Sequence, residues 1–205
     1  VGGDTNKGKE FCYSAAVFGE IPFKPLLRKN AVAGDLLVLT GEIGSAAAGL
    51  FCALNKKKCP KKFLQAQNTP QINFELCKKL IAVASAGVDL SDGLGKELND
   101  VARQSRKMLV VEWEKLPFDK RLPVLCKKNN WNLEDLLFHR GEDYQIVYAI
   151  PASKERFARS AGGIVFGRVF ESAGGKGADG AGLFLEKKGV LSGINAKGYE
   201  HFKSN

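Results

Sequence analysis

Two aspartates three residues apart, Asp89 and Asp92, have the spacing that most directly suggests chemistry. They lie in the segment Val88–Leu94, between a short apolar run and a stretch of helical periodicity. Carboxylates at the end of a strand can face one ion, and Mg²⁺ prefers oxygen ligands combined with retained waters and substrate phosphates. The Ser91 hydroxyl and the free amides of the following helix could bind a phosphate. The alternative is that Ser91 or Asp92 only caps that helix.

Two further acidic segments could supply ligand contacts. Near the start of the chain, Gly3 lets the backbone approach a phosphate while Asp4 holds a metal, although a turn containing aspartate has the same pattern. The segment Arg140–Tyr144 places Glu142 in a loop directly before an expected strand, where ligand-binding residues often lie. Spacing alone favours a solvated turn in which Arg140 pairs with an acid.

Other chemistry has less support in the sequence. The loop Gly41–Ser45 resembles one that approaches a phosphate, but it lacks the lysine of a P-loop. Arg28 offers a forked guanidinium for an ATP phosphate, although an isolated arginine in a linker is more often a surface residue. The five cysteines form no CxxC pair, the two histidines have no metal spacing, and GxSxG is absent, which disfavours zinc sites, disulfide frameworks and hydrolases. No covalent nucleophile is predicted.

Apolar periodicity predicts the elements that would position these residues. Strands are expected at 11–18, 36–40, 87–90, 108–113, 144–150, 164–169, 182–186 and 190–191. Helices are expected at 45–54, 71–85, 91–105, 119–128, 133–138 and 153–160, and a loop at 174–182. This alternation predicts an α+β fold, a mixed sheet covered by helices, with a domain boundary at the prolines near residue 25.

The formal charge of +9 over 205 residues suggests an anionic partner. The densest basic run, Lys56–Lys62, has no interleaved aromatic residues, so a solvated loop is favoured over nucleic-acid binding, and a phosphate-rich small substrate also suits the charge. No membrane span or secretory signal is apparent, so a cytoplasmic protein with reduced cysteines is expected. The start at Val1 suggests an incomplete piece.

Four motifs together resemble the thiamine-monophosphate kinases. They are Gly-Gly-Asp-Thr at 2–5, Asp-Leu-Ser-Asp-Gly-Leu at 89–94, Gly-Glu-Asp-Tyr at 141–144 and Lys-Gly-Tyr-Glu-His-Phe at 197–202. They follow the family's order and approximate separation over the carboxyl-terminal part of its chain. The resemblance implies the fold of aminoimidazole ribonucleotide synthetase-like proteins, with residues 1–25 as the end of an amino-terminal ATP-binding domain and 26–205 as the carboxyl-terminal α/β domain.

The resemblance also implies an activity, the transfer of the γ-phosphoryl group of ATP to thiamine monophosphate, with Mg²⁺ as cofactor and a homodimer as the complete enzyme. Nucleic acid and membrane are not expected partners. The residues implied to bind ligands are, for magnesium, Asp4, Asp89 and Asp92; for ATP, Gly3, Asp4, Arg28 and Ser91; and for the thiamine moiety, Glu142 and Tyr199. An aromatic face at Tyr199 would attract the cationic rings, and its alternative is a tail residue that pins the carboxyl terminus to the core.

The chain departs from the family pattern in two places. Ser45-Ala46-Ala47 stands where the family has Asp-Ser-Ala, and Gln65–Pro70 stands where the family has a basic, proline-containing stretch. The family's amino-terminal domain lies outside this sequence, so the chain by itself is expected to be inactive or nearly so. Two other functions stay open: another ATP-binding member of the same superfamily, or a non-catalytic nucleotide-binding module.

Overall fold

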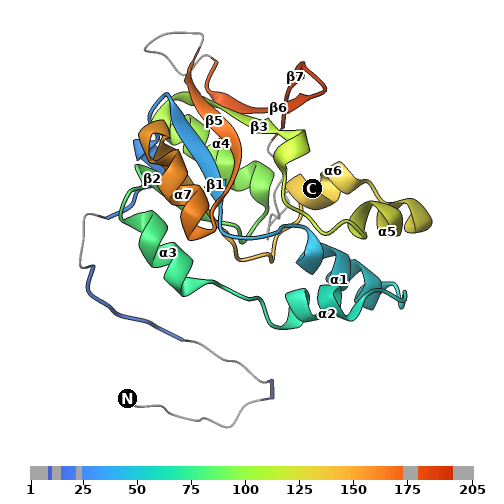
Figure 1. Ribbon diagram of the computed structural model, residues 1–205. Coiled ribbons are helices and arrows are strands. Elements are labelled where there is room, and N and C mark those ends of the chain that lie inside the picture. Colours follow the sequence, from blue (N-terminus) through green and yellow to red (C-terminus); the bar gives the residue numbers. More distant parts are fainter. Residues whose placement is uncertain (1–8, 11–14, 22–24, 173–179, 196–205) are drawn as a thin grey trace.

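A computed structural model gives the fold and describes residues 9–10, 15–21, 25–172 and 180–195 (Figure 1). The strands are β1 (Asp35–Leu39), β2 (Ala86–Asp89), β3 (Lys107–Glu112), β4 (Ile146–Pro151), β5 (Ile164–Glu171), β6 (Gly182–Lys187) and β7 (Val190–Gly193). The α-helices are α1 (Ser45–Leu54), α2 (Lys61–Asn68), α3 (Phe74–Ile81), α4 (Leu94–Ser105), α5 (Leu122–Asn129), α6 (Leu133–Phe138) and α7 (Glu155–Ala161). Three 3-10 turns are η1 (Arg28–Asn30), η2 (Trp113–Lys115) and η3 (Ala152–Lys154).

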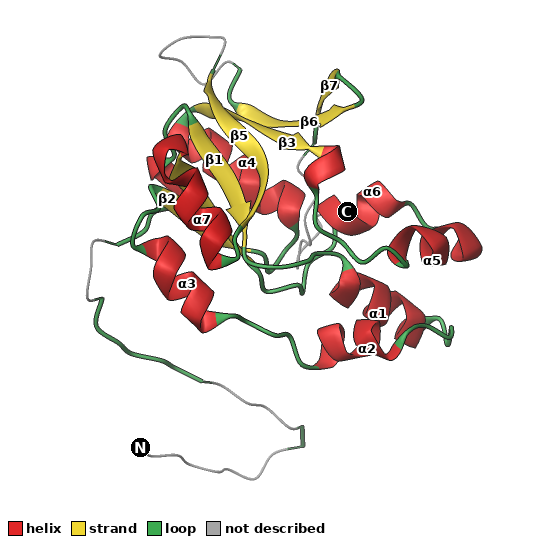
Figure 2. Cartoon of the chain, viewed as in Figure 1, coloured by secondary structure: helices red, strands yellow, loops and turns green. Residues whose placement is uncertain are grey.

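The seven strands form one sheet in the order β2-β4-β1-β5-β3-β6-β7. Antiparallel pairing joins β2 to β4, β4 to β1, β1 to β5, β5 to β3 and β6 to β7, whereas β3 and β6 are parallel. Helices lie against this sheet in Figure 2. The predicted α+β fold with a mixed, helix-covered sheet is therefore confirmed.

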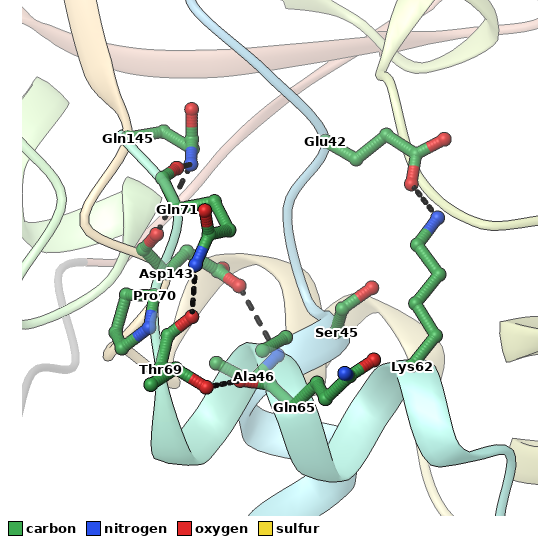
Figure 3. A pocket seen from close by; sticks show the side chains of 11 residues that line it. Glu42, Ser45, Ala46, Lys62, Gln65, Thr69, Pro70, Gln71, Asp143 and Gln145 are labelled. Atoms are coloured by element: carbon green, nitrogen blue, oxygen red, sulfur yellow. Dashed lines mark hydrogen bonds and ion pairs between the residues drawn. The ribbon is translucent and has the colours of Figure 1, made fainter. Parts of the chain in front are cut away.

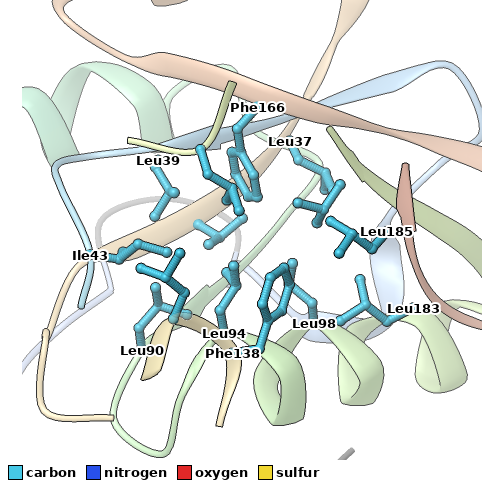
Figure 4. Packing of buried hydrophobic residues seen from close by; sticks show 14 of the residues in the cluster. Leu37, Leu39, Ile43, Leu90, Leu94, Leu98, Phe138, Phe166, Leu183 and Leu185 are labelled. Atoms are coloured by element: carbon cyan, nitrogen blue, oxygen red, sulfur yellow. The ribbon is translucent and has the colours of Figure 1, made fainter. Parts of the chain in front are cut away.

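Both faces of the sheet are buried near its centre, and β1 shows why. Its side chains alternate between two clusters, with Leu37 and Leu39 on one face and Leu36 and Val38 on the other. The first face packs against α4 and α6, as Figure 4 shows for several of the leucine and phenylalanine side chains, and the second packs against α3 and α7. Burying each leucine stabilises the fold by about 2 kcal/mol relative to exposure. A strand buried on both faces reads as the continuous apolar run seen in the sequence.

Several predicted elements are wrong or shifted. Residues 11–14 lie outside the described part, but residues 15–18 of the predicted strand form no strand, and Val17 and Phe18 are more than 90% exposed. Helix α3 begins at Phe74 and not at residue 71, because the Asn73 side chain accepts a hydrogen bond from the Leu76 amide at 3.0 Å and caps the helix. The predicted loop at 174–182 lies mostly outside the described residues, and Gly182 begins β6.

Helix α2 was not predicted, because it is polar and buries little beyond Phe63. The lysine-rich run is therefore only partly a loop: residues 56–58 are exposed loop, and Lys61 begins the helix. Lys62 pairs with Glu42 at 2.5 Å and with Asp119 at 2.9 Å, so this lysine holds α2 against the core. Helix α2 packs closely on α1 at Gly49, which has no side chain. A β-carbon added there would lie only 2.1 Å from the Phe63 carbonyl oxygen.

Candidate functional site

Asp89 is the last residue of β2, and Ser91 and Asp92 lie in the short loop between β2 and the start of α4. The helix is capped by Gly93, which has φ +114° and no side-chain hydrogen bond to the helix. The alternative that Ser91 or Asp92 merely caps α4 is therefore wrong. Gly93 is required here because an added β-carbon would lie 3.0 Å from the carbonyl oxygens of Phe138 and Arg140, in a backbone conformation that side chains rarely adopt.

A second acidic loop, residues 140–145, packs directly against the first. The Glu142 amide donates to the Ser91 carbonyl at 3.0 Å, and the Tyr144 amide donates to the Leu90 carbonyl at 3.1 Å. Gly141 allows this approach, since its added β-carbon would lie 1.8 Å from the Ser91 carbonyl oxygen. Glu142 and Tyr144 have φ of +72° and +49°, a strained conformation of the kind that concentrates at functional sites. The fold thus joins two of the motifs that lie about 50 residues apart.

Arg28 brings a cation to the same loops. Its guanidinium lies 3.7 Å from an Asp89 oxygen and 3.0 Å from a Glu97 oxygen, and about two fifths of the arginine side chain is exposed. The arginine is therefore partly at the surface, as the alternative expected, but its guanidinium also pairs with the buried Glu97 carboxylate. Its proposed contact with ATP stays a prediction.

Glu97 is the acidic residue that sequence reasoning missed. It is 3% exposed, and burial raises the pKa of its carboxyl; nearby Asp89 and Asp92 raise that pKa further, while Arg28 and Lys96 lower it. The signal was available, because Glu97 interrupts the apolar stripe of α4 formed by Leu94, Leu98 and Val101. A charged residue on a buried helix face needs a partner, and Arg28 supplies it.

The remaining contacts show that the two loops share one electrostatic environment. The Asp92 carboxylate pairs with Lys96 one helical turn later. The Tyr144 hydroxyl donates to a Glu142 oxygen at 3.1 Å. Burial, the bond to Glu142 and the charges of Asp89 and Asp92 all raise the pKa of the Tyr144 phenol. The side chains of both loops therefore lie close enough to influence one another.

Within the described ranges, no group of three histidine, cysteine, aspartate or glutamate side chains could hold a metal. Asp89 and Asp92 have the donor chemistry that Mg²⁺ prefers, and each pairs with a cation of the chain, Arg28 or Lys96, that a bound metal ion would have to displace. Gly3, Asp4 and Tyr199 lie outside the described residues. The convergence of Asp4 with the other two aspartates therefore stays a prediction.

The neighbouring residues of the second loop have structural partners. Arg140 pairs with Asp135 at 3.1 Å, as the solvated-turn alternative expected, and its guanidinium also lies over the Phe51 ring at 5.2 Å. Asp143 accepts hydrogen bonds from the amides of Gly44 at 2.7 Å and Ala46 at 3.3 Å. Burial raises the pKa of the Asp143 carboxyl to about 6, although these two amides oppose the shift. The backbone amides at the start of α1 are thus occupied by the carboxylate of Asp143.

Comparison with known proteins gives consistent relatives. No protein-family model matches the sequence. Thiamine-monophosphate kinases of Pyrococcus horikoshii and Nitrosopumilus maritimus are 29% and 31% identical to it, each over 99% of this chain and over 61% and 64% of their own lengths. The chain therefore spans less than two thirds of these relatives.

Solved structures agree with the sequence relatives. A structure described as AaThiL complexed with AMPPCP and TMP has a TM-score of 0.71 and 29% identity, covering 86% of this chain and 54% of that one. The hydrogenase maturation protein HypE has a TM-score of 0.73 at 17% identity, covering 91% of this chain and 60% of its own, and shows the shared fold alone. The resemblance of this chain to the thiamine-monophosphate kinases is thus confirmed by sequence over nearly its whole length and by fold.

Proposed function

We propose that this chain is the carboxyl-terminal part of an ATP-dependent kinase that converts thiamine monophosphate into thiamine diphosphate. The observation that carries the proposal is the direct packing of the Asp89–Asp92 loop on the Gly141–Tyr144 loop, with Arg28 beside them. The relatives named above support the choice of substrates. Residues 1–25 would then close an amino-terminal ATP-binding domain, and residues 26–205 would form the carboxyl-terminal domain.

The chemistry needs positioning and charge neutralisation more than it needs a nucleophile. Two polyanions must be brought into line while cations offset their repulsion, and the acceptor phosphate oxygen attacks the γ-phosphorus directly. Asp89 and Asp92, with Asp4, would hold Mg²⁺, which supplies charge neutralisation at the phosphates. Arg28 would donate to a phosphate oxygen of ATP, and Ser91 would add a hydroxyl contact.

Glu142 and Tyr199 would contact the thiamine moiety. The left-handed backbone conformation of Glu142 supports this role, because strained backbone of this kind concentrates at ligand-binding sites. The contact of Tyr199 rests on the resemblance.

A homodimer and a cytoplasmic location are also part of the proposal. Sedimentation of the complete protein tests the homodimer. In the described part of the chain, no helix is long and apolar enough to cross a bilayer, and the four cysteines there are unpaired thiols.

Turnover is the direct test. The complete protein, given ATP, Mg²⁺ and thiamine monophosphate, should form thiamine diphosphate and ADP in equal amounts, followed by chromatography. Asp89→Asn should lower kcat by at least about 100-fold because it weakens the metal site. Glu75→Gln is the matched control, since Glu75 is an exposed acid of α3 whose partner is Lys78. Equal activity in both variants would remove Asp89 from the mechanism.

Binding experiments separate the two other functions. Calorimetry of this chain with ATP and Mg²⁺ shows whether it binds the nucleotide. A nucleotide-binding module would bind ATP in this experiment, and the complete protein would show no turnover. Another ATP-using member of the superfamily would bind ATP but not thiamine monophosphate. Binding of both substrates without product would favour a non-catalytic role.

A further inference from the structure

Glu97 is an acid on the buried face of α4, and stability alone does not explain its place there. It is 3% exposed and lies among the apolar residues Leu94, Leu98 and Val101 of that helix. A buried ion pair is a weak source of stability, because the cost of taking both charges out of water offsets their attraction, and an apolar side chain of similar volume is often as stable. The carboxylate at this position therefore points to a role in the neighbouring site.

Glu97 contacts the side chain of Arg28 and not its backbone. The backbone of η1 is held by Ser105, at the end of α4, whose hydroxyl donates to the Arg28 carbonyl at 2.9 Å and accepts from the Ala31 amide at 3.1 Å. The Glu97 carboxylate instead accepts from the Arg28 guanidinium at 3.0 Å. Ser105 therefore attaches η1 to the helix, and Glu97 orients the guanidinium.

The contacts of Arg28 leave most of its guanidinium available to a ligand. One terminal nitrogen, Nη2, donates to Glu97 and also lies 3.7 Å from an Asp89 oxygen, which is beyond the usual hydrogen-bond range of about 2.7 to 3.2 Å. Among the described residues, no hydrogen bond engages the other terminal nitrogen or Nε. Because the arginine is partly exposed, these donors can meet an anion while Asp89 keeps its oxygens for a cation.

Two lysines near the same loops are less suited to a phosphate. Lys62 lies in the polar pocket between α1 and α2, where it pairs with Glu42, as Figure 3 shows, and also with Asp119, so two carboxylates would repel an anion there. Lys96 pairs with Asp92, which is itself a proposed magnesium ligand. Arg28 can keep its buried partner and still bind a phosphate, because a planar guanidinium presents donors along more than one edge.

We propose that Glu97 is a positioning residue for nucleotide binding: its buried carboxylate holds one edge of the Arg28 guanidinium, so that the other edges meet a phosphate group of ATP. The inference rests on the proposed function, in which Arg28 binds ATP. Charge alone predicts the opposite effect of removing Glu97, because an acid near a polyanion repels it. Loss of the anchor weakens binding instead, because the freed guanidinium can turn to Asp89 or to water and must be ordered again when ATP binds.

The test measures the affinity of the complete protein for ATP with Mg²⁺, by calorimetry and without an acceptor. Glu97→Met keeps the length of the side chain and removes its charge, and it should weaken ATP binding about tenfold. The melting temperature should be unchanged or raised, because an apolar side chain suits the buried face, so weaker binding is not a folding defect. Ser105→Ala is the matched control: it removes both hydrogen bonds that hold the η1 backbone, so it should lower the melting temperature and change ATP affinity much less.

A double substitution shows whether Glu97 acts through Arg28. Arg28→Ala should itself weaken ATP binding about tenfold or more, and adding Glu97→Met should then cause no further loss. Unchanged or tighter ATP binding by Glu97→Met, additive losses in the double variant, or an equal loss in Ser105→Ala would each overturn the inference.

The result does not depend on the acceptor, because the binding assay contains none. The expected loss of ATP affinity in Glu97→Met, in a protein that forms no thiamine diphosphate, would reject only the proposed kinase activity. Formation of thiamine diphosphate by a protein in which Glu97→Met binds ATP normally would reject only the positioning role. Absence of ATP binding by the wild type would reject both.

Discussion

An alanine at position 141 would force apart the two loops that carry Asp92 and Glu142. Its β-carbon would lie 1.8 Å from the Ser91 carbonyl oxygen, whereas ordinary contacts begin at 3.4 Å, so the backbones would have to separate by about 1.6 Å. That movement breaks the 3.0 Å hydrogen bond from the Glu142 amide to Ser91. Overpacking costs about 1 to 3 kcal/mol and a lost hydrogen bond about 1 kcal/mol, so Gly141→Ala should lower the free energy of unfolding by about 2 to 4 kcal/mol.

Urea unfolding measures this loss, and turnover of the complete protein measures its effect on the site. We expect kcat to fall more than stability at the assay temperature explains, since a misplacement of about 1 Å can reduce rates about 100-fold. Gly19→Ala is the control: Gly19, like Gly141, does not have a positive φ, but a β-carbon added to it has open space. If Gly141→Ala loses no more stability than Gly19→Ala and retains full activity, the close packing of the two loops has no functional importance.

Three other substitutions give separate predictions. Folding raises the pKa of the Asp143 carboxyl to about 6, so the stability that this carboxyl contributes is complete below about pH 4 and is lost as the pH rises through 6. The difference in free energy of unfolding between wild type and Asp143→Asn should therefore change by at most about 3 kcal/mol over that range. A difference that does not change with pH would refute the pKa shift. Arg28→Ala should cost about 1 to 3 kcal/mol at pH 7, less in a Glu97→Gln background, by urea unfolding; equal losses in both backgrounds would deny the coupling. Gly49→Ala should lower the melting temperature by separating α1 from α2, and an unchanged midpoint would contradict that contact.

Elements with apolar periodicity could be predicted from the sequence, because burial determines both the pattern and the structure. Helices 45–54 and 133–138 have the predicted bounds. Apart from 11–18, each predicted strand begins and ends within two residues of the strand in the structure. Helix α2 was missed because its stability comes from packing against α1 and from the Lys62 ion pairs, which involve residues distant in sequence. The predicted strand at 11–18 illustrates the reverse case, since β-propensity in residues 15–18 meets no partner strand.

The candidate site was only partly readable in the sequence. The acidic motifs at 89–92 and 141–144 were recognisable in the sequence. The contact between them could be seen only in the structure, because the hydrogen bonds that join them link backbone atoms and leave no mark on the side chains. The pairing of Arg28 with Glu97 was invisible, since 69 residues separate them. The magnesium and ligand roles of the individual residues stay predictions, and turnover and binding measurements will decide them.

The position of β1 at the middle of the sheet has a consequence for synthesis of the protein. Both neighbours of β1 come from chain made much later, because Leu39 pairs with Val147 and Leu36 with Arg168. A nascent polypeptide must therefore keep an apolar strand without its neighbours until the ribosome has passed residue 168. Contacts between such distant segments slow folding, and chains released before β5 is made would expose an apolar strand that is prone to aggregation.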